Sequence, residues 1–291
     1  MIQGLLKKCN PDIIISFEPK STYYMQTTLR KINANIPLIT MFHFSTENAF
    51  DVESTIETSA IKNSNMVQVL TKADEKSLRQ VIPNCHVTYI PNIVPQYEDI
   101  KRQGERTHVI LNVGRLDRNQ KRQHILLESF ASLIGEFPDW KVILVGEDRE
   151  QGLYLAQLQE IIRKYQMDDR VIIHSPVKNI LAYYCRADIF AFPSSYEGFP
   201  LAMTEAMSTG LPVVGMKNCI AVKEIIHDGE DGILTNDDVD SFAEGLRKLM
   251  IDDKLRIKMG EMAHRNMAKY SPNAIWNQWN VVINQLVSHA R

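Results

Sequence analysis

Residues 188–215 read DIFAFPSSYEGFPLAMTEAMSTGLPVVG, and this stretch decides the fold class of the chain. Ile189–Phe192 is a short, uninterrupted apolar run, which is typical of a strand buried on both faces. Leu201–Ser208 carries good helix formers and ends before Gly210, which predicts a helix with a glycine near its C-terminus. Leu211–Val214 reads as the next strand. The order strand, loop, helix, strand predicts an α/β protein with a parallel sheet.

Two carboxylates flank the start of this predicted helix. Glu197 lies in the loop before it, and Glu205, after seven intervening residues, falls roughly one and a half turns inside it. The N–H groups and the positive dipole end of a helix start form a ready site for an anion such as a nucleotide phosphate. The alternative is structural: Glu197 favours the helix dipole, and Glu205 faces solvent.

Length and composition bound the class of protein. At 291 residues the chain exceeds the usual size of one core, so two domains are expected. Its 44% hydrophobic and 23% charged residues are typical of globular proteins, and the net charge of −2 argues against a nucleic-acid partner. There is no membrane-length apolar run and no signal peptide, and the four cysteines lack metal-ligand spacing. These features predict a cytoplasmic protein with reduced thiols.

The first part of the chain alternates helices with short apolar strands, which predicts a Rossmann-like domain over residues 1–98. Pro91–Gly104 has little periodicity and is expected to link this domain to the next. The expected strands are Ile13–Phe17, Pro37–Phe44, Met66–Leu70 and His86–Ile90, and the expected helices are Ile2–Cys9, Met25–Asn33, Glu53–Ser64 and Thr71–Val81.

The pattern restarts after the linker and predicts a second Rossmann-like domain over residues 105–271. Its expected strands are His108–Val113, Lys141–Val145, Val171–Ile173, Ile189–Phe192, Leu211–Val214 and one within Gly229–Leu234, with a turn at Val222–Ile226. Its expected helices are Gln123–Leu133, Gly152–Tyr165, Ile180–Cys185, Leu201–Ser208, Ser241–Met250 and Lys254–Met267. A last helix, residues 272–291, carries Trp276, Trp279, Val282, Ile283 and Leu286 at helical spacing, which predicts core packing.

Two cations follow the first strand of the second domain. Gly114 and Arg115 come directly after it, and Lys121 stands six residues after Arg115. Ligands of open parallel sheets bind beyond the carboxyl ends of the strands, so both cations are expected at the inter-domain crevice. Arg115 as a planar fork and Lys121 as a point charge suit a diphosphate. The alternative is an ordinary solvated basic loop.

The segments Glu197-Gly198-Phe199-Pro200-Leu201, Glu205-Ala206-Met207 and Gly210-Leu211-Pro212-Val213-Val214 together carry a resemblance to a known family. They resemble the retaining, nucleotide-sugar-dependent glycosyltransferases of the family 4 type (glycosyl transferases group 1), which have a GT-B fold of two Rossmann-like domains. The resemblance implies sugar transfer from a UDP- or GDP-sugar to a hydroxyl of a saccharide or lipid-linked saccharide, in bacterial surface polysaccharide or glycolipid synthesis. It also implies that the last helix packs back on the first domain.

The resemblance assigns a role to each candidate residue. Glu197 would hold the donor sugar and stabilise its cation-like centre. His43 would contact the sugar from the first domain. The alternative for His43 is a structural role, which is common for a lone His at a strand end. Glu205 would accept hydrogen bonds from the ribose hydroxyls. The nucleotide base would be held by backbone near Val177, and the leaving diphosphate by Arg115, Lys121 and the helix start at Gly198, Phe199, Pro200 and Leu201.

The implied reaction keeps the anomeric configuration, with the leaving phosphate as base, and requires neither a metal nor a cofactor because cations replace the metal. Asp237-Asp238-Val239-Asp240 reads instead as a loop and helix start.

Compared with the family, the chain is expected to lack roughly the first fifth to quarter of the fold before Met1. The first domain is therefore expected to be incomplete. Two hypotheses follow: a glycosyltransferase, at the inner face of a membrane where its acceptor is a lipid, or a non-catalytic, nucleotide-binding subunit that needs a partner.

Overall fold

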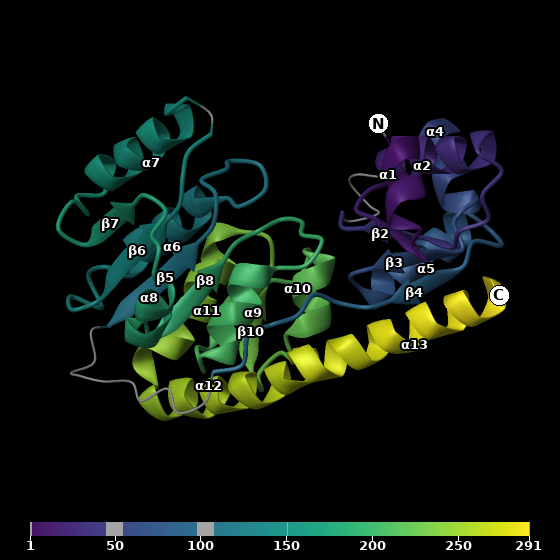
Figure 1. The fold of residues 1–291 in the computed structure, drawn as a ribbon. Coiled ribbons are helices and arrows are strands. Elements are labelled where there is room, and N and C mark those ends of the chain that lie inside the picture. The colour runs from purple at the N-terminus through teal and green to yellow at the C-terminus, as the bar shows by residue number, and fades with distance from the viewer. Residues whose placement is uncertain (1, 45–54, 98–107, 150, 291) are drawn as a thin grey trace. The chain divides into compact units, whose positions relative to one another are not determined.

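The computed structural model describes residues 2–44, 55–97, 108–149 and 151–290 (Figure 1). The chain forms two compact units. Unit 1 comprises Met1–Ile93 and Pro272–Arg291, and unit 2 comprises Val94–Ser271. Both units are built on a parallel sheet with helices in the crossovers, which confirms the α/β fold class.

Unit 1 has four parallel strands in the order β1-β2-β3-β4, so consecutive strands are neighbours. The register places Ile39 opposite Met66 and Val67 opposite Val87. The strands are β1 (Ile14–Ser16), β2 (Leu38–Phe42), β3 (Met66–Val69) and β4 (Val87–Tyr89). The helices are α1 (Ile2–Cys9), α2 (Pro19–Lys31), α4 (Thr55–Lys62), α5 (Lys72–Val81) and α13 (Pro272–Ala290).

Local capping explains where two helices of unit 1 begin. The side chain of Thr71 accepts a hydrogen bond from the Asp74 N–H at 3.0 Å, so α5 starts where the sequence predicts. α2 begins at Pro19, earlier than the predicted Met25, because proline suits the first turn of a helix. The buried face of α2 is largely polar, with Thr22 and Gln26, and therefore lacks an apolar period.

Unit 2 has a six-stranded parallel sheet in the order β10-β9-β8-β5-β6-β7. Helix α6 packs against α7 and α11, and α9 packs against α12. The strands are β5 (Val109–Val113), β6 (Lys141–Val145), β7 (Val171–His174), β8 (Ile189–Phe192), β9 (Val213–Met216) and β10 (Gly232–Thr235). The helices are α6 (Gln123–Leu133), α7 (Leu153–Lys164), α8 (Leu181–Arg186), α9 (Leu201–Ser208), α10 (Ile220–Ile225), α11 (Val239–Ile251), α12 (Asp253–Met267) and the 3₁₀ turn η1 (Ala268–Tyr270).

Two predictions for the segment after α9 were wrong. The turn predicted at Val222–Ile226 is instead the helix α10, which is too short for its apolar period to show in the sequence. The strand predicted at Leu211–Val214 begins later, at Val213, because Pro212 has no N–H to give to a sheet; its carbonyl accepts from the Phe190 N–H at 3.0 Å.

The end of α9 needs its glycine. Gly210 has a φ of +79°, and Thr209 is the C-cap, so Gly210 occupies the left-handed position that follows a helix. A Cβ on Gly260 of α12 would lie 2.2 Å from the Gly210 carbonyl oxygen. Glycine at position 260 therefore lets α12 approach the end of α9 closely.

The packing prediction for α13 holds for part of its apolar face. Trp279 and Val282 are each 9% exposed, whereas Trp276 is 56% exposed, so its predicted core role was wrong. Trp276 is three residues from Trp279, and a helix turn of 3.6 residues places it toward the edge of the buried stripe.

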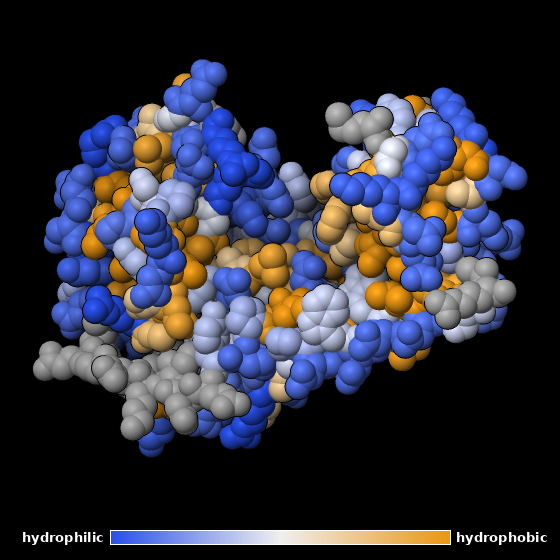
Figure 2. Space-filling model, in the orientation of Figure 1, coloured by the Kyte–Doolittle hydropathy of each residue, from blue (hydrophilic) through white to orange (hydrophobic). Residues whose placement is uncertain are grey.

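Hydrophilic residues cover much of the face seen in Figure 2, with hydrophobic residues between them. Among the helices whose residues the structure describes, none combines the length and apolar character that crossing a membrane requires.

Candidate functional site

The strand order of unit 2 reverses at β5, which pairs with β6 on one side and with β8 on the other. The chain runs outward through β6 and β7 and then returns to β8. Ligands of open α/β sheets bind beyond the carboxyl ends of the strands at such a switch point. Residues 114–122 follow β5 and residues 193–200 follow β8, so both predicted site loops lie at this edge.

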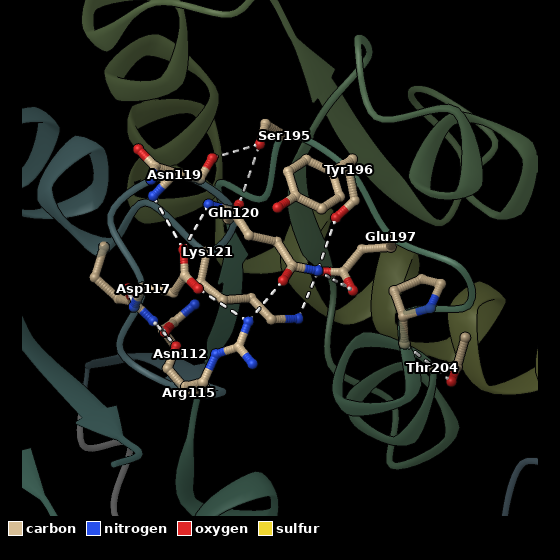
Figure 3. Close-up of polar contacts among 12 residues, drawn as sticks. Asn112, Arg115, Asp117, Asn119, Gln120, Lys121, Ser195, Tyr196, Glu197 and Thr204 are labelled. Carbon is tan, nitrogen blue, oxygen red and sulfur yellow. Dashed lines mark hydrogen bonds and ion pairs between the residues drawn. The ribbon is translucent and has the colours of Figure 1, made fainter. Parts of the chain in front are cut away.

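Hydrogen bonds join these two loops (Figure 3). The Ser195 N–H donates to the Gln120 carbonyl at 2.9 Å, and the Ser195 hydroxyl donates to the Asn119 carbonyl at 2.8 Å. The Gln120 side-chain amide donates to the Tyr196 carbonyl at 3.2 Å. The loop after β5 is thereby fixed against the loop that carries Glu197.

Lys121 and Glu197 form an ion pair across the two loops. Lys121 Nζ lies 2.5 Å from Glu197 Oε1, and the two side chains are only 18% and 7% exposed. The ammonium also lies 5.2 Å from the centre of the Phe192 ring. The stem of Lys121 runs beside Gly114, where a Cβ would lie 3.7 Å from Lys121 Cδ and Cε. The positive charge is therefore partly desolvated and balanced by Glu197.

Arg115 is held at the same edge but stays accessible. One guanidinium nitrogen donates to Asp117 Oδ2 and to Gln120 Oε1, both at 2.9 Å, and the side chain is 40% exposed. Asp117 also accepts from the backbone N–H groups of Asn119 and Gln120, so it shapes the loop. Arg115 keeps further N–H groups with which to bind an anion.

A cavity of about 300 Å³ opens beside this loop. It brings together four of the predicted site residues, which are Gly114, Arg115, Val177 and Glu205. The ends of β5 and β6 approach closely in its wall, because a Cβ on Gly146 would lie 1.9 Å from the Gly114 carbonyl oxygen. The cavity is large enough to be a small-molecule site.

Glu205 lies on α9 and faces Tyr184 of α8. The Tyr184 hydroxyl donates to Glu205 Oε2 at 3.1 Å, and both residues line the cavity. Burial raises the pKa of the Glu205 carboxyl, while the hydrogen bond from Tyr184 acts in the opposite direction. Burial, and then the neighbouring charge of Glu205, raise the pKa of Tyr184, so this phenol stays protonated and can donate.

The predicted helix-start residues have different environments. Phe199 is 8% exposed and packs edge-on against Tyr270, with ring centres 5.5 Å apart, so its ring belongs to the core. Pro200 is the N-cap of α9, and its carbonyl accepts from the Thr204 N–H at 3.0 Å. The Leu201 side chain is 44% exposed. Gly198 precedes them in the loop, and none of these four residues lines the cavity itself.

His43 lies directly after β2 in unit 1. Burial lowers its pKa, and the neighbouring Gln68 side chain counters this effect only in part. The imidazole is therefore neutral over a wider range of pH than an exposed one. Its contact with a donor sugar stays a prediction.

Acidic residues elsewhere have structural contacts. Asp238 caps α11 by accepting from the Ser241 N–H at 2.7 Å, as the sequence predicts. In the part of the chain that the structure describes, His, Cys, Asp and Glu side chains form no cluster of three or more that could hold a metal. Cys9, Cys85, Cys185 and Cys219 are free thiols.

Sequence reasoning missed several lining residues of the cavity, among them Gly146, Glu147, Arg149 and Tyr184. Gly146 and Glu147 directly follow β6, and that position at a strand end was a usable signal. Tyr184 lies inside a six-residue helix, and nothing local marks it as part of a site.

The site thus combines a cavity at a topological switch point with two nearby cations and two carboxylates. The family model of glycosyl transferases group 1 matches residues 94–266. The chain belongs to this family.

Two relatives are similar to this chain over most of its length. The chain is 30% identical over 227 residues to the amylovoran biosynthesis glycosyltransferase AmsD of Erwinia amylovora, covering 75% of this chain and 62% of AmsD. It is 29% identical over 216 residues to the exopolysaccharide phosphotransferase SCO2592 of Streptomyces coelicolor, covering 74% of this chain but 22% of that protein. These matches thus span less than two thirds of either relative.

The fold resembles that of Anabaena Alr3699/HepE, solved in complex with UDP, with a TM-score of 0.85 at 19% identity, covering 98% of this chain and 81% of HepE. Sucrose-phosphate synthase of Thermosynechococcus elongatus gives a TM-score of 0.82 at 20% identity, covering 99% and 77%. The two Rossmann-like sheets and these likenesses establish the GT-B fold.

Proposed function

We propose that this chain transfers a sugar from a nucleotide-sugar donor to a hydroxyl of a saccharide or lipid-linked saccharide acceptor. The observation that carries this proposal is the cavity beside β5, whose wall includes Arg115 and Glu205. The Lys121–Glu197 pair lies beside it, because the stem of Lys121 runs past the lining residue Gly114. Cations for a diphosphate and a carboxylate for hydroxyl groups are the two chemistries that such a donor needs.

Departure of the nucleoside diphosphate leaves positive charge on the anomeric carbon and adds negative charge to the leaving phosphate. Stabilising both charges in a fixed, partly desolvated site is the main contribution that a protein makes to such a reaction. Arg115 and Lys121 take the leaving diphosphate in this proposal, together with the start of α9. Glu197 stabilises the sugar cation, and His43 contacts the sugar.

Retention of the anomeric configuration follows in this proposal from attack on the face that the diphosphate leaves. A leaving-phosphate oxygen takes the acceptor hydroxyl proton as the new C–O bond forms. Bond breaking, bond formation and proton transfer then balance without a metal or a cofactor.

The names of relatives support the donor and acceptor classes. HepE was solved with UDP, and Staphylococcus aureus TarM was solved with UDP and α-GlcNAc-glycerol. A Campylobacter jejuni relative, 30% identical over 161 residues, is named as an N-acetylgalactosaminyltransferase for a diphospho-undecaprenol-linked sugar. We therefore favour a UDP-sugar over a GDP-sugar, and an acceptor in surface polysaccharide or glycolipid synthesis. The cytoplasmic location and the contact with the inner face of a membrane stay predictions.

A second candidate is a nucleotide-binding subunit that acts with a partner. Within the described residues β1 pairs with β2 on one side only, so its other edge can accept a strand from elsewhere. One structural neighbour was solved as a GtfA/B complex. Donor hydrolysis by the isolated chain would favour the first candidate.

Calorimetric titration with UDP, GDP and ADP, with and without Mg²⁺, tests the donor site. We expect one nucleotide to bind without Mg²⁺ and the matching donor sugar to be hydrolysed slowly. A folded, monodisperse sample that binds none of the three would refute the proposed donor site.

A further inference from the structure

The packing of Tyr184 does not require its hydroxyl group, which instead contacts Glu205. Tyr184 is 1% exposed, and its ring packs edge-on against Phe190 with ring centres 6.0 Å apart. A phenylalanine would keep this packing. The hydroxyl is what tyrosine adds, and it donates to Glu205 Oε2 within the cavity wall.

The geometry constrains which part of Glu205 can serve a ligand. A carboxylate is an acceptor through both oxygens, and Tyr184 occupies Oε2. Among the residues that the structure describes, the Glu205 carboxylate accepts no other hydrogen bond. Oε1 is thus left to accept from a ligand, while the bond at Oε2 fixes the rotation of the carboxylate.

The second effect of the phenol is electrostatic. Burial raises the pKa of Glu205, and the Tyr184 hydrogen bond favours the ionised form. Tyr97, whose own pKa is raised by burial and by the charge of Glu205, also faces this carboxylate from residues 94–97. Tyr184 therefore helps to keep Glu205 ionised in a site that otherwise favours protonation.

We infer that Tyr184 is a positioning residue for ribose recognition: it orients Glu205 so that the free carboxylate oxygen accepts from the ribose hydroxyls of the donor. This inference rests on the proposed function, because it needs a nucleotide in the cavity. It adds a residue of α8 to a cavity whose other lining residues come mainly from the ends of β5 and β6, the loops after β5, β6 and β7, and α9.

The test compares ribonucleotide with deoxyribonucleotide. Calorimetry would give the Kd of UDP, 2′-deoxy-UDP and inorganic pyrophosphate. If the protein binds GDP instead of UDP, GDP and 2′-deoxy-GDP replace the two uridine nucleotides. The variants are Tyr184→Phe and Glu205→Gln. Tyr183→Phe is the matched control, because Tyr183 is the neighbouring tyrosine of α8 and lines a different cavity, with Val109 and Ile143.

We expect the wild type to prefer the ribonucleotide by at least roughly tenfold, the scale of a hydrogen bond to a charged group. Tyr184→Phe should reduce this preference several-fold and leave the Kd of pyrophosphate unchanged. Glu205→Gln should act in the same direction, and adding Tyr184→Phe to it should have little further effect. Tyr183→Phe should change neither quantity.

Three outcomes separate the possibilities. A Tyr184→Phe variant that keeps the full ribose preference overturns the inference and leaves the proposed function standing. Equal weakening of pyrophosphate and nucleotide overturns it in favour of general damage to the site. A wild type that binds none of UDP, GDP and ADP overturns the proposed function and the inference together.

Circular dichroism would show that each variant is folded. Glu205→Asp supplies a second test where Tyr184→Phe does not fold, because it keeps the charge but draws the carboxylate away from the Tyr184 hydroxyl. It should also lose ribose preference without a change in pyrophosphate affinity, and an unchanged preference overturns the inference.

Discussion

The Lys121–Glu197 ion pair makes a specific prediction for Glu197→Gln. In the protein without ligand, Lys121 Nζ lies 2.5 Å from Glu197 Oε1, and both side chains are largely buried. The substitution removes the carboxylate charge and keeps the shape of the side chain. It leaves a poorly solvated ammonium whose strongest counter-charge has gone.

The magnitude follows from burial. Opposite charges about 4 Å apart attract by roughly 4 kcal/mol at an effective dielectric constant of about 20. Removing one partner of a buried pair destabilises proteins by about 3–5 kcal/mol. Because Lys121 is still 18% exposed, we expect the lower end, a loss of about 3 kcal/mol in the free energy of unfolding.

A bound diphosphate would replace the lost counter-charge. Recovery of half to nearly all of that energy corresponds to roughly tenfold to hundredfold tighter binding of the nucleoside diphosphate. Sugar transfer should nevertheless fall by orders of magnitude, because in the proposed reaction the Glu197 carboxylate stabilises the sugar cation. Lys121→Ala should instead weaken diphosphate binding.

Urea unfolding and calorimetry with the nucleoside diphosphate measure both effects. The double variant Glu197→Gln/Lys121→Met should recover much of the lost stability but lose the tighter diphosphate binding, because the ammonium is gone. Arg247→Gln is the control, because it breaks an ion pair with Glu136 whose side chains are 42% and 45% exposed, and should change stability far less than Glu197→Gln. Weaker diphosphate binding by Glu197→Gln than by the wild type would refute the reasoning.

Two further substitutions test the cavity wall. Glu205 has a raised pKa in the folded protein, so the wild type should gain stability as pH falls from that pKa toward the unfolded value. Glu205→Gln should lack this gain. Urea unfolding between pH 4 and 8 should therefore show that the variant is most stable relative to the wild type at high pH. Parallel curves of unfolding free energy against pH for the two proteins would contradict the burial of a charged Glu205. Gly146→Ala should lose about 1–3 kcal/mol of stability and weaken nucleotide binding, because its Cβ would lie 1.9 Å from the Gly114 carbonyl oxygen. Gly135→Ala, whose Cβ has nothing within 4 Å, should be unaffected, and equal melting temperatures for both variants would contradict the packing argument.

Buried elements were predicted well from the sequence. The bounds of α6, β6, β8 and α9 in unit 2 are those predicted, because uninterrupted apolar runs and flanking glycine or proline mark buried strands and their connections. The short helix α10 was missed because it has too few residues to show a period. Trp276 was misplaced because periodicity gives the direction of a helix face but not the width of the surface that covers it.

The site was only partly predictable for a related reason. Position after a strand end indicated Gly114, Arg115 and Glu197, because the parallel topology sends those ends to one edge. The partner of Lys121, however, lies 76 residues away in the sequence, and no local spacing links the two. The contact of Tyr184 with Glu205 likewise depends on how α8 packs beside α9, which is a property of the folded sheet.

The paired charges change how the site should work. Arg115 contacts Asp117, Lys121 contacts Glu197, and Arg122 contacts Asp237, so each of these cations already has a carboxylate partner in the protein without ligand. A donor diphosphate must then compete for Lys121, and its success releases Glu197. In the proposed reaction the released carboxylate is the group that stabilises the sugar cation. When the diphosphate leaves, Lys121 would return to Glu197. Glu197 therefore competes with the nucleoside diphosphate product for Lys121, and this competition opposes tight binding of the product.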